Sequence, residues 1–202
     1  MKINEWLQFF SQYYQKKLFS ISDLNQLVDE PALSISVQLT RLVHAKIIMR
    51  VAHGWYANPF HPPFPEEIAM VLRLPCYLSL EYALSRKGVL SQHVYTLTLV
   101  TLQTPYTFRT EKVWYEFHKI NQPLFWGYED EQGILVGTVE KALLDLLYIR
   151  GVRTKEFTTS QFRSLLDDMD LELLQKQRLR DYAKRFGKGT RALAVELDLL
   201  TK

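Results

Sequence analysis

The proline-rich run from Asn58 to Pro65, NPFHPPFP, places the strongest constraint on how this chain can fold. It holds four of the eight prolines in the sequence. Proline fixes the backbone angle φ and removes an amide donor, so we expect this run to be extended and stiff. The run therefore predicts a domain boundary, with one domain over residues 1–58 and a second over residues 59–202.

The segment before this boundary shows three helical patterns followed by a β-hairpin. Residues Ile3–Lys17 carry aromatic and aliphatic side chains at helical spacing. Ser20–Asp23 has the spacing of a capping box and opens a short second helix. A third helix is expected over Ser34–Lys46, with the hydroxyl of Ser34 as its cap. Two β-prone runs, IIMRV and WYA, flank a turn whose glycine, Gly54, can adopt positive φ. This order predicts a winged helix-turn-helix.

The third helix has one apolar side and one side suited to DNA. At about 100° per residue, Ile35, Leu39, Leu42 and Val43 share the side expected to be buried. The opposite side offers a guanidinium, an imidazole, hydroxyls and methyl groups, which can read base edges and phosphates. The wing would lie along the DNA backbone. The predicted DNA contacts are Ser36, Val37, Thr40, Arg41 and His44 on the helix, with Arg50 and His53 on the wing.

Two other interpretations of this helix stay open at the level of sequence. The outward side is also typical of a solvated surface that contains a chance arginine. In addition, some winged modules use the same fold only for contacts with other proteins.

The segment after the boundary mixes helical and β patterns. Helices are predicted over Pro65–Leu72 and from Tyr77 onward, the second capped by Ser79 and closed by Gly88. Three runs with β-branched or aromatic alternation predict an antiparallel sheet: Val94–Leu102, Thr104–Thr110 and Lys112–Ile120. An acidic turn at 129–133, a short strand ILV and a helix from Thr138 to Gly151 follow. Three helices close the chain, at 160–169, 171–186 and 191–200.

The predicted fold class is therefore α+β: an N-terminal winged helix-turn-helix, then a mixed α/β domain with a small antiparallel sheet and a helical C-terminus. Composition agrees with a globular protein, since 47% of residues are hydrophobic and 23% are charged. The net charge of +3 favours a specific binder over a protein that coats polyanions.

Cysteine content and the length of apolar runs bear on the cellular location of the protein. A single cysteine, Cys76, excludes an intramolecular disulfide, suits a reducing cytosol and is expected to be a buried thiol. No run approaches about 18 apolar residues, and polar residues interrupt the amino-terminal segment, so neither a membrane span nor a secretory signal is predicted. We expect a cytoplasmic protein with no membrane partner.

An enzyme is the other hypothesis: the carboxylates and lysine of a metal-dependent nuclease would be Glu140, Lys141 and Asp145, with Asp130 and Glu131. The spacing is poor, because adjacent helical residues point about 100° apart. The five histidines are scattered, and no glycine-rich phosphate loop or nucleophile elbow is present. We predict no catalytic residue, no metal site and no cofactor, and keep the nuclease only as a minor alternative.

A basic run from Lys176 to Arg191 holds seven cationic side chains against one acid, Asp181. Helical spacing places Arg180, Lys184 and Lys188 in one basic stripe. The stripe is either a solvated helix face or a contact for an acidic partner, which would be a protein surface or further DNA phosphate.

Four strings in the second segment resemble, in order and spacing, the AbiEi family of type IV toxin–antitoxin antitoxins. They are YLSLEYALSRKGVL, YTLTLVTLQTPYTFRT, YEFHKINQPLFWGY and TVEKALLDLLYIRG. The resemblance implies an amino-terminal winged helix-turn-helix that represses its own operon at inverted repeats in the operator DNA. It also implies a carboxy-terminal region that counters a nucleotidyltransferase toxin encoded beside it, as part of phage defence. Whether that toxin is touched directly stays open.

The sequence departs from the family at two positions. Val139 stands where the family commonly has a proline before the Glu-Lys-Ala-Leu run. Ala45-Lys46 stands where the family has a glycine after the recognition helix. The alternatives to an antitoxin are a winged-helix protein-interaction module and a stand-alone transcriptional regulator without a toxin.

Overall fold

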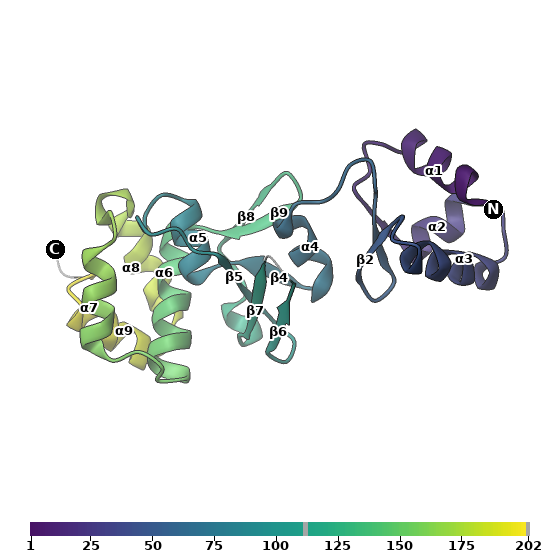
Figure 1. The fold of residues 1–202 in the computed structure, drawn as a ribbon. Helices are drawn as coiled ribbons and strands as arrows, with labels where there is room; N and C mark the ends of the chain where they lie inside the picture. Colours follow the sequence, from purple (N-terminus) through teal and green to yellow (C-terminus); the bar gives the residue numbers. More distant parts are fainter. Residues whose placement is uncertain (111–112, 201–202) are drawn as a thin grey trace. The chain divides into compact units, whose positions relative to one another are not determined.

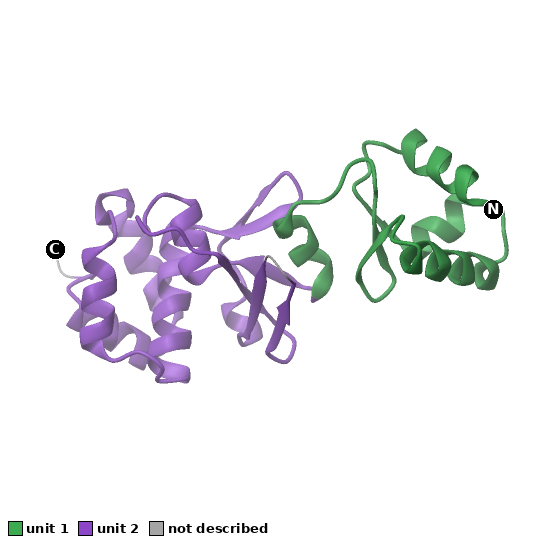
Figure 2. Cartoon of the chain, in the orientation of Figure 1, with its two compact units in different colours: residues 1–72 green, residues 73–202 purple. Residues whose placement is uncertain are grey.

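The computed structural model describes residues 1–110 and 113–200, which form two compact units, Met1–Leu72 and Arg73–Lys202 (Figure 2). The fold class expected from the sequence, α+β with helices before the first sheet and a helical C-terminus, is confirmed. Among the described residues, no helix combines the length and apolar character needed to cross a bilayer.

The first unit is a winged helix-turn-helix (Figure 1). Its two antiparallel pairings give the strand order β1-β3-β2. The elements in chain order are α1 (Ile3–Gln12), β1 (Leu18–Ser20), α2 (Ile21–Leu27), α3 (Ala32–His44), β2 (Met49–Ala52), β3 (Trp55–Ala57) and α4 (Pro65–Leu72).

The first helix is shorter than predicted. It ends at Gln12 rather than Lys17, because the chain turns and Leu18–Ser20 then pairs with β3 as the first strand. The fully buried side chain of Asn58 holds this turn, donating hydrogen bonds to the carbonyls of Phe10, Tyr13 and Lys16 at 3.0–3.2 Å. A residue at the predicted domain boundary therefore belongs to the core of the first unit.

The two helix caps predicted in the first unit have different outcomes. The capping box of α2 is confirmed: the Asp23 amide donates to the Ser20 hydroxyl at 3.0 Å and the Ser20 amide donates to the Asp23 carboxylate at 2.8 Å. The cap by Ser34 is wrong, because α3 begins at Ala32 after Pro31. Ser34 instead lies in the first turn and its hydroxyl donates to Glu30 at 3.0 Å.

Just beyond the C-terminal end of α3, Lys46 adopts a φ of 57°, in the left-handed region. Glycine fills such positions at the least steric cost.

The compact first unit ends at Leu72 rather than at Asn58. The proline-rich run and α4 pack on the turn between α1 and β1. Lys17 forms an ion pair with Glu67 at 2.8 Å, and His61 stacks on Tyr14 with ring centroids 4.8 Å apart. The ammonium of Lys17 also lies 4.4 Å from the ring centroid of Phe64.

The second unit is built on a six-stranded sheet with the order β6-β7-β5-β4-β9-β8 (Figure 1). The expected antiparallel sheet is wrong in detail, because β5 runs parallel to β7 and β4 runs parallel to β9. The strands are β4 (Cys76–Leu78), β5 (Thr96–Thr101), β6 (Tyr106–Arg109), β7 (Trp114–Lys119), β8 (Tyr128–Glu131) and β9 (Ile134–Gly137). Lys112, the predicted start of the third run, lies outside the described residues.

Two of these strands were missed. Tyr77 was expected to open a helix, but it lies in β4, and the acidic turn expected at 129–133 is largely strand β8. The buried thiol of Cys76 is confirmed, and burial raises its pKa to about 12.

The helices of the second unit are α5 (Leu80–Arg86), η1 (Gln122–Leu124), α6 (Val139–Leu146), η2 (Leu147–Arg153), α7 (Thr159–Asp167), η3 (Leu171–Leu173), α8 (Lys176–Arg185) and α9 (Lys188–Glu196). Figure 1 shows α6, α7, α8 and α9 gathered at one end of this unit. Thr138 caps α6 by accepting from the Lys141 amide, as predicted. The chain then continues as the wider π-helical turn η2. Within η2, an added Cβ at Gly151 would lie 2.6 Å from Leu193, so only glycine allows this approach to α9.

We predict that α4 contributes to the stability of the first unit. A fragment covering residues 1–72 should unfold at a higher temperature than one covering 1–58, because the shorter fragment loses the Lys17–Glu67 pair and the cover over Tyr14. Circular dichroism melts would measure this. Glu67→Gln in the longer fragment is the matched control, and should cost about 1 kcal/mol or less. Equal melting temperatures for the two fragments would contradict the prediction.

Candidate nucleic-acid interface

One side of α3 is buried in the aromatic core of the first unit. Ile35 and Leu39 are fully buried and Leu42 nearly so, as predicted, while Val43 is half-buried. The core they join includes Trp6, Phe9, Phe10, Phe19 and Leu24. The indole of Trp6 also donates to the Gln38 side chain at 2.7 Å. These contacts fix which side of α3 faces outward.

Every helical residue predicted to contact DNA is exposed. Ser36, Val37, Thr40, Arg41 and His44 all lie on the outward side of α3. At 100° per residue they fall within an arc of about 140°. The Thr40 hydroxyl donates to the Ser36 carbonyl at 2.9 Å, so this hydroxyl already has a partner within the helix. The structure thus presents the predicted residues together, on a single helical face.

The wing residues Arg50 and His53 are also exposed and contact each other. The Arg50 guanidinium lies 2.9 Å from His53 Nδ1 and donates to the Ala52 carbonyl at 3.3 Å. Because arginine can only donate, His53 Nδ1 is the acceptor in this contact. Gly54 adopts a φ of +71° and closes the hairpin. The wing therefore carries a guanidinium held at its turn.

The outward surface of α3 and the wing contains no carboxylate. From Pro31 to Pro65 the sequence has no Asp or Glu, whereas Arg41, Lys46 and Arg50 all carry positive charge. Such a surface attracts a polyanion, because it has no carboxylate to repel the phosphate groups. Leu33, which is 83% exposed on the same face, was not among the residues predicted from the sequence. Its spacing of four residues before Val37 was the available signal.

The predicted basic stripe of Arg180, Lys184 and Lys188 is wrong. Arg180 and Lys184 lie one turn apart on α8, but Lys188 is the first residue of α9. The helix breaks because Phe186 adopts an extended backbone and buries its ring. Arg180 is half-buried, while Lys184 is exposed and pairs with Asp181 at 2.7 Å.

The carboxylates considered for a nuclease do not assemble around one lysine. Glu140 accepts from the Gln175 amide at 2.9 Å, whereas Lys141 points into the core. In β8, Asp130 accepts from the Gly133 amide at 2.6 Å, and Glu131 pairs with Lys87 and Arg86. Among the described residues, no three His, Cys, Asp or Glu side chains are grouped in a way that could hold a metal ion.

Lys141 instead forms a fully buried polar network with Asp145, Tyr77 and Ser79. The ammonium donates to the Asp145 carboxylate and, at 2.7 Å, to the Tyr77 hydroxyl. Asp145 also accepts from the hydroxyls of Tyr77 and Ser79, at 2.8 Å each. Burial lowers the pKa of Lys141 and raises the pKa of Asp145, and the opposite charge of each partner works against this shift. The network joins β4 to α6.

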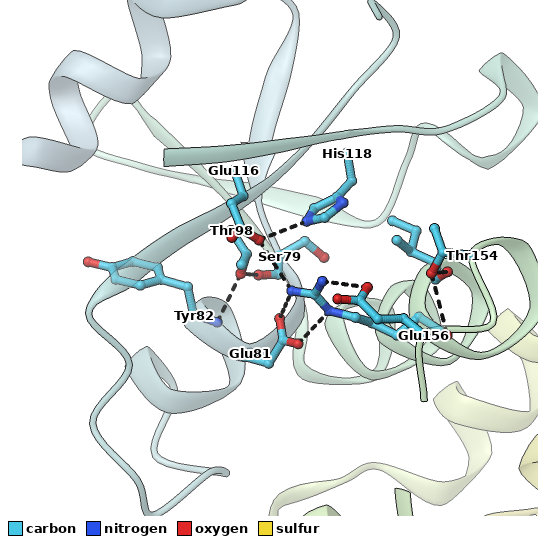
Figure 3. Close-up of polar contacts among 10 residues, drawn as sticks. Ser79, Glu81, Tyr82, Thr98, Glu116, His118, Thr154 and Glu156 are labelled. Carbon is cyan, nitrogen blue, oxygen red and sulfur yellow. Dashed lines mark hydrogen bonds and ion pairs between the residues drawn. The ribbon is translucent and has the colours of Figure 1, made fainter. Parts of the chain in front are cut away.

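A second polar cluster surrounds the guanidinium of Arg150 in η2 (Figure 3). Glu81 of α5 and Glu156 accept from it at 2.8 Å, and Glu116 of β7 lies 3.4 Å away. Burial works to lower the pKa of Arg150, but the hydrogen bonds and charges of Glu81 and Glu156 raise it overall. His118 lies 3.5 Å from Glu116. These ion pairs tie a helix, a strand and η2 together, which is a structural role.

Comparison with known proteins does not place the chain in a family. No protein-family model matches it, and no curated protein matches it.

We predict that the Lys141–Asp145 pair is critical for stability. Lys141→Met should cost about 3 to 5 kcal/mol, because it leaves the Asp145 carboxylate buried without its counter-charge. The double variant Lys141→Met/Asp145→Leu should recover most of this loss. Urea unfolding would measure both.

Lys184→Met is the matched control, since Lys184 is an exposed lysine in an ion pair. It should change the free energy of unfolding by less than about 1 kcal/mol. A cost for Lys141→Met no larger than that of this control would show that the buried pair is dispensable.

Proposed function

We propose that this protein is a DNA-binding transcriptional repressor that uses α3 and the wing to recognise its operator. The observation that carries the proposal is the exposed, carboxylate-free surface on which all seven predicted contact residues lie. In a winged helix-turn-helix, α3 enters the major groove and the wing follows the phosphate backbone. The operator would lie upstream of its own operon and contain inverted repeats, as the AbiEi resemblance implies.

We further propose that the protein is a cytoplasmic antitoxin of a type IV toxin–antitoxin operon, which counters a nucleotidyltransferase toxin encoded beside it. The support is the resemblance of four strings to the AbiEi family. These strings cover β4 to α5, β5 to β6, β7 to η1, and α6 to η2. They supply the Lys141 network and much of the buried core of the second unit. The resemblance therefore concerns how the second unit folds, and it supplies no toxin-contacting residues.

A second candidate is a winged module that binds another protein. The exposed apolar side chains Leu33 and Val37 on α3 favour this alternative. The absence of carboxylates between Pro31 and Pro65 favours DNA, since it leaves a surface with only positive charge.

DNA recognition through α3 predicts different effects for Arg41 and Arg50. Arg41→Ala should weaken binding by about 1 to 3 kcal/mol and relax the choice of base, if this side chain grips a guanine. Arg50→Ala should weaken binding to all sequences and reduce the slope of log affinity against log salt by about 0.9, the value of one lost phosphate contact. Mobility shifts with the upstream region would measure both.

Lys155→Ala, which removes an exposed cation in the second unit, is the control and should bind like the wild type. The repressor proposal would be contradicted if wild type and Arg41→Ala had the same affinity, both for the upstream region and for unrelated DNA.

The basic residues of α8 and α9 are predicted to serve antitoxicity rather than DNA binding. Lys184→Glu/Lys188→Glu changes two exposed side chains and should alter stability by about 1 kcal/mol or less, mainly through the exposed Lys184–Asp181 pair. Operator binding should also be unchanged, while cells expressing the neighbouring toxin should lose protection. A growth assay with inducible toxin would measure this. Lys155→Glu is the control for an added negative charge. Full protection by the double variant would show that Lys184 and Lys188 face water and contact no partner.

A further inference from the structure

Leu33 is an apolar residue whose side chain is exposed and does not contribute to the core of the first unit. It lies in the first turn of α3 and is 83% exposed, more than any other large hydrophobic side chain in the described part of the chain. Val37 follows one turn later and is 48% exposed. Neither residue belongs to the core cluster on the other side of the helix.

These two side chains lie in the middle of the outward face. At 100° per residue, Val37 is about 40° from Leu33 around the helix, with His44 between them in angle. Ser36 and Arg41 lie towards the two margins of the same face, about 60° and 80° from Leu33. Leu33 and Val37 would therefore face whatever α3 contacts.

The chemistry of the major groove offers one apolar group to such side chains. Each thymine presents its C5 methyl there, whereas the other base-edge groups are hydrogen-bond donors or acceptors. Residues near the start of a recognition helix are those that reach base edges. The surroundings of Leu33 and Val37 suit DNA, because the cations Arg41 and Lys46 lie on the same carboxylate-free segment.

We infer that Leu33 and Val37 contact thymine methyl groups in the operator half-site. The inference rests on the proposed DNA binding and adds its base preference. Four residues of helix advance about 6 Å along the axis, and one base pair of B-DNA about 3.4 Å. Because a helix in the major groove runs obliquely to the DNA axis, the two thymines would lie one or two base pairs apart.

The test begins by selecting duplexes that bind the full-length protein from a random DNA library. Each thymine of the enriched half-site is then replaced by deoxyuridine, which removes only the methyl group. At two positions one or two base pairs apart, this replacement should weaken wild-type binding about three- to fivefold, the effect of losing one buried methyl contact.

Variants assign each methyl contact to a side chain. Leu33→Ala should abolish the response to deoxyuridine at one position, and Val37→Ala at the other. Both changes favour the helix, so the fold should be retained, and a circular dichroism melt checks this. The salt dependence of binding should stay unchanged, because no phosphate contact is lost. Leu173→Ala, at a 48% exposed leucine in the second unit, is the control and should respond like the wild type.

The outcomes separate this inference from the proposed function. Specific DNA binding with no response to deoxyuridine, or with the response retained in both variants, would overturn the role of Leu33 and Val37 while leaving the repressor intact. Failure to enrich any duplex would overturn both. Binding of a protein partner that is lost in Leu33→Ala, together with no DNA binding, would identify this face as a protein-docking surface instead.

Discussion

Burial of one side of α3 is the constraint on which the candidate interface depends. Ile35, Leu39 and Leu42 are anchored among the aromatic side chains of α1 and β1, so the helix cannot rotate without exposing them. That fixed rotation turns Arg41 outward and keeps the face that contains Leu33 free of the core. The hydrogen bond from Trp6 to Gln38 adds a directional contact at the same seam. Packing in the core of the first unit therefore determines which side chains of α3 face the solvent.

The second unit depends on polar contacts made where water is excluded. Lys141, Asp145, Tyr77 and Ser79 satisfy one another in a site with no exposed side-chain surface on the charged pair. Taking two charges out of water is costly, and removing one partner is worse than replacing both. Gly127 leaves the space that Lys141 occupies, since a Cβ there would lie 3.0 Å from the lysine side chain. The network thereby fixes how α6 sits against β4.

Local chemistry explains the parts of the structure that were predictable. The Ser20–Asp23 capping box, the Thr138 cap, the α4 boundaries and the hairpin closed by Gly54 each involve residues a few positions apart. The buried and exposed sides of α3 follow from its period of 3.6 residues. For the candidate site, the sequence pattern identified seven of the exposed residues on α3 and the wing. It overlooked Leu33, because the helix was expected to begin at Ser34.

The sequence by itself determined the α+β class, the helical period of α3 and the lack of carboxylates on its outward face, because these are properties of neighbouring residues. Only the tertiary structure decided the mixed sheet, since a strand has the same local pattern whether its partner runs parallel or antiparallel. It also decided that Lys141 is buried, because its partner Tyr77 lies 64 residues earlier in the chain.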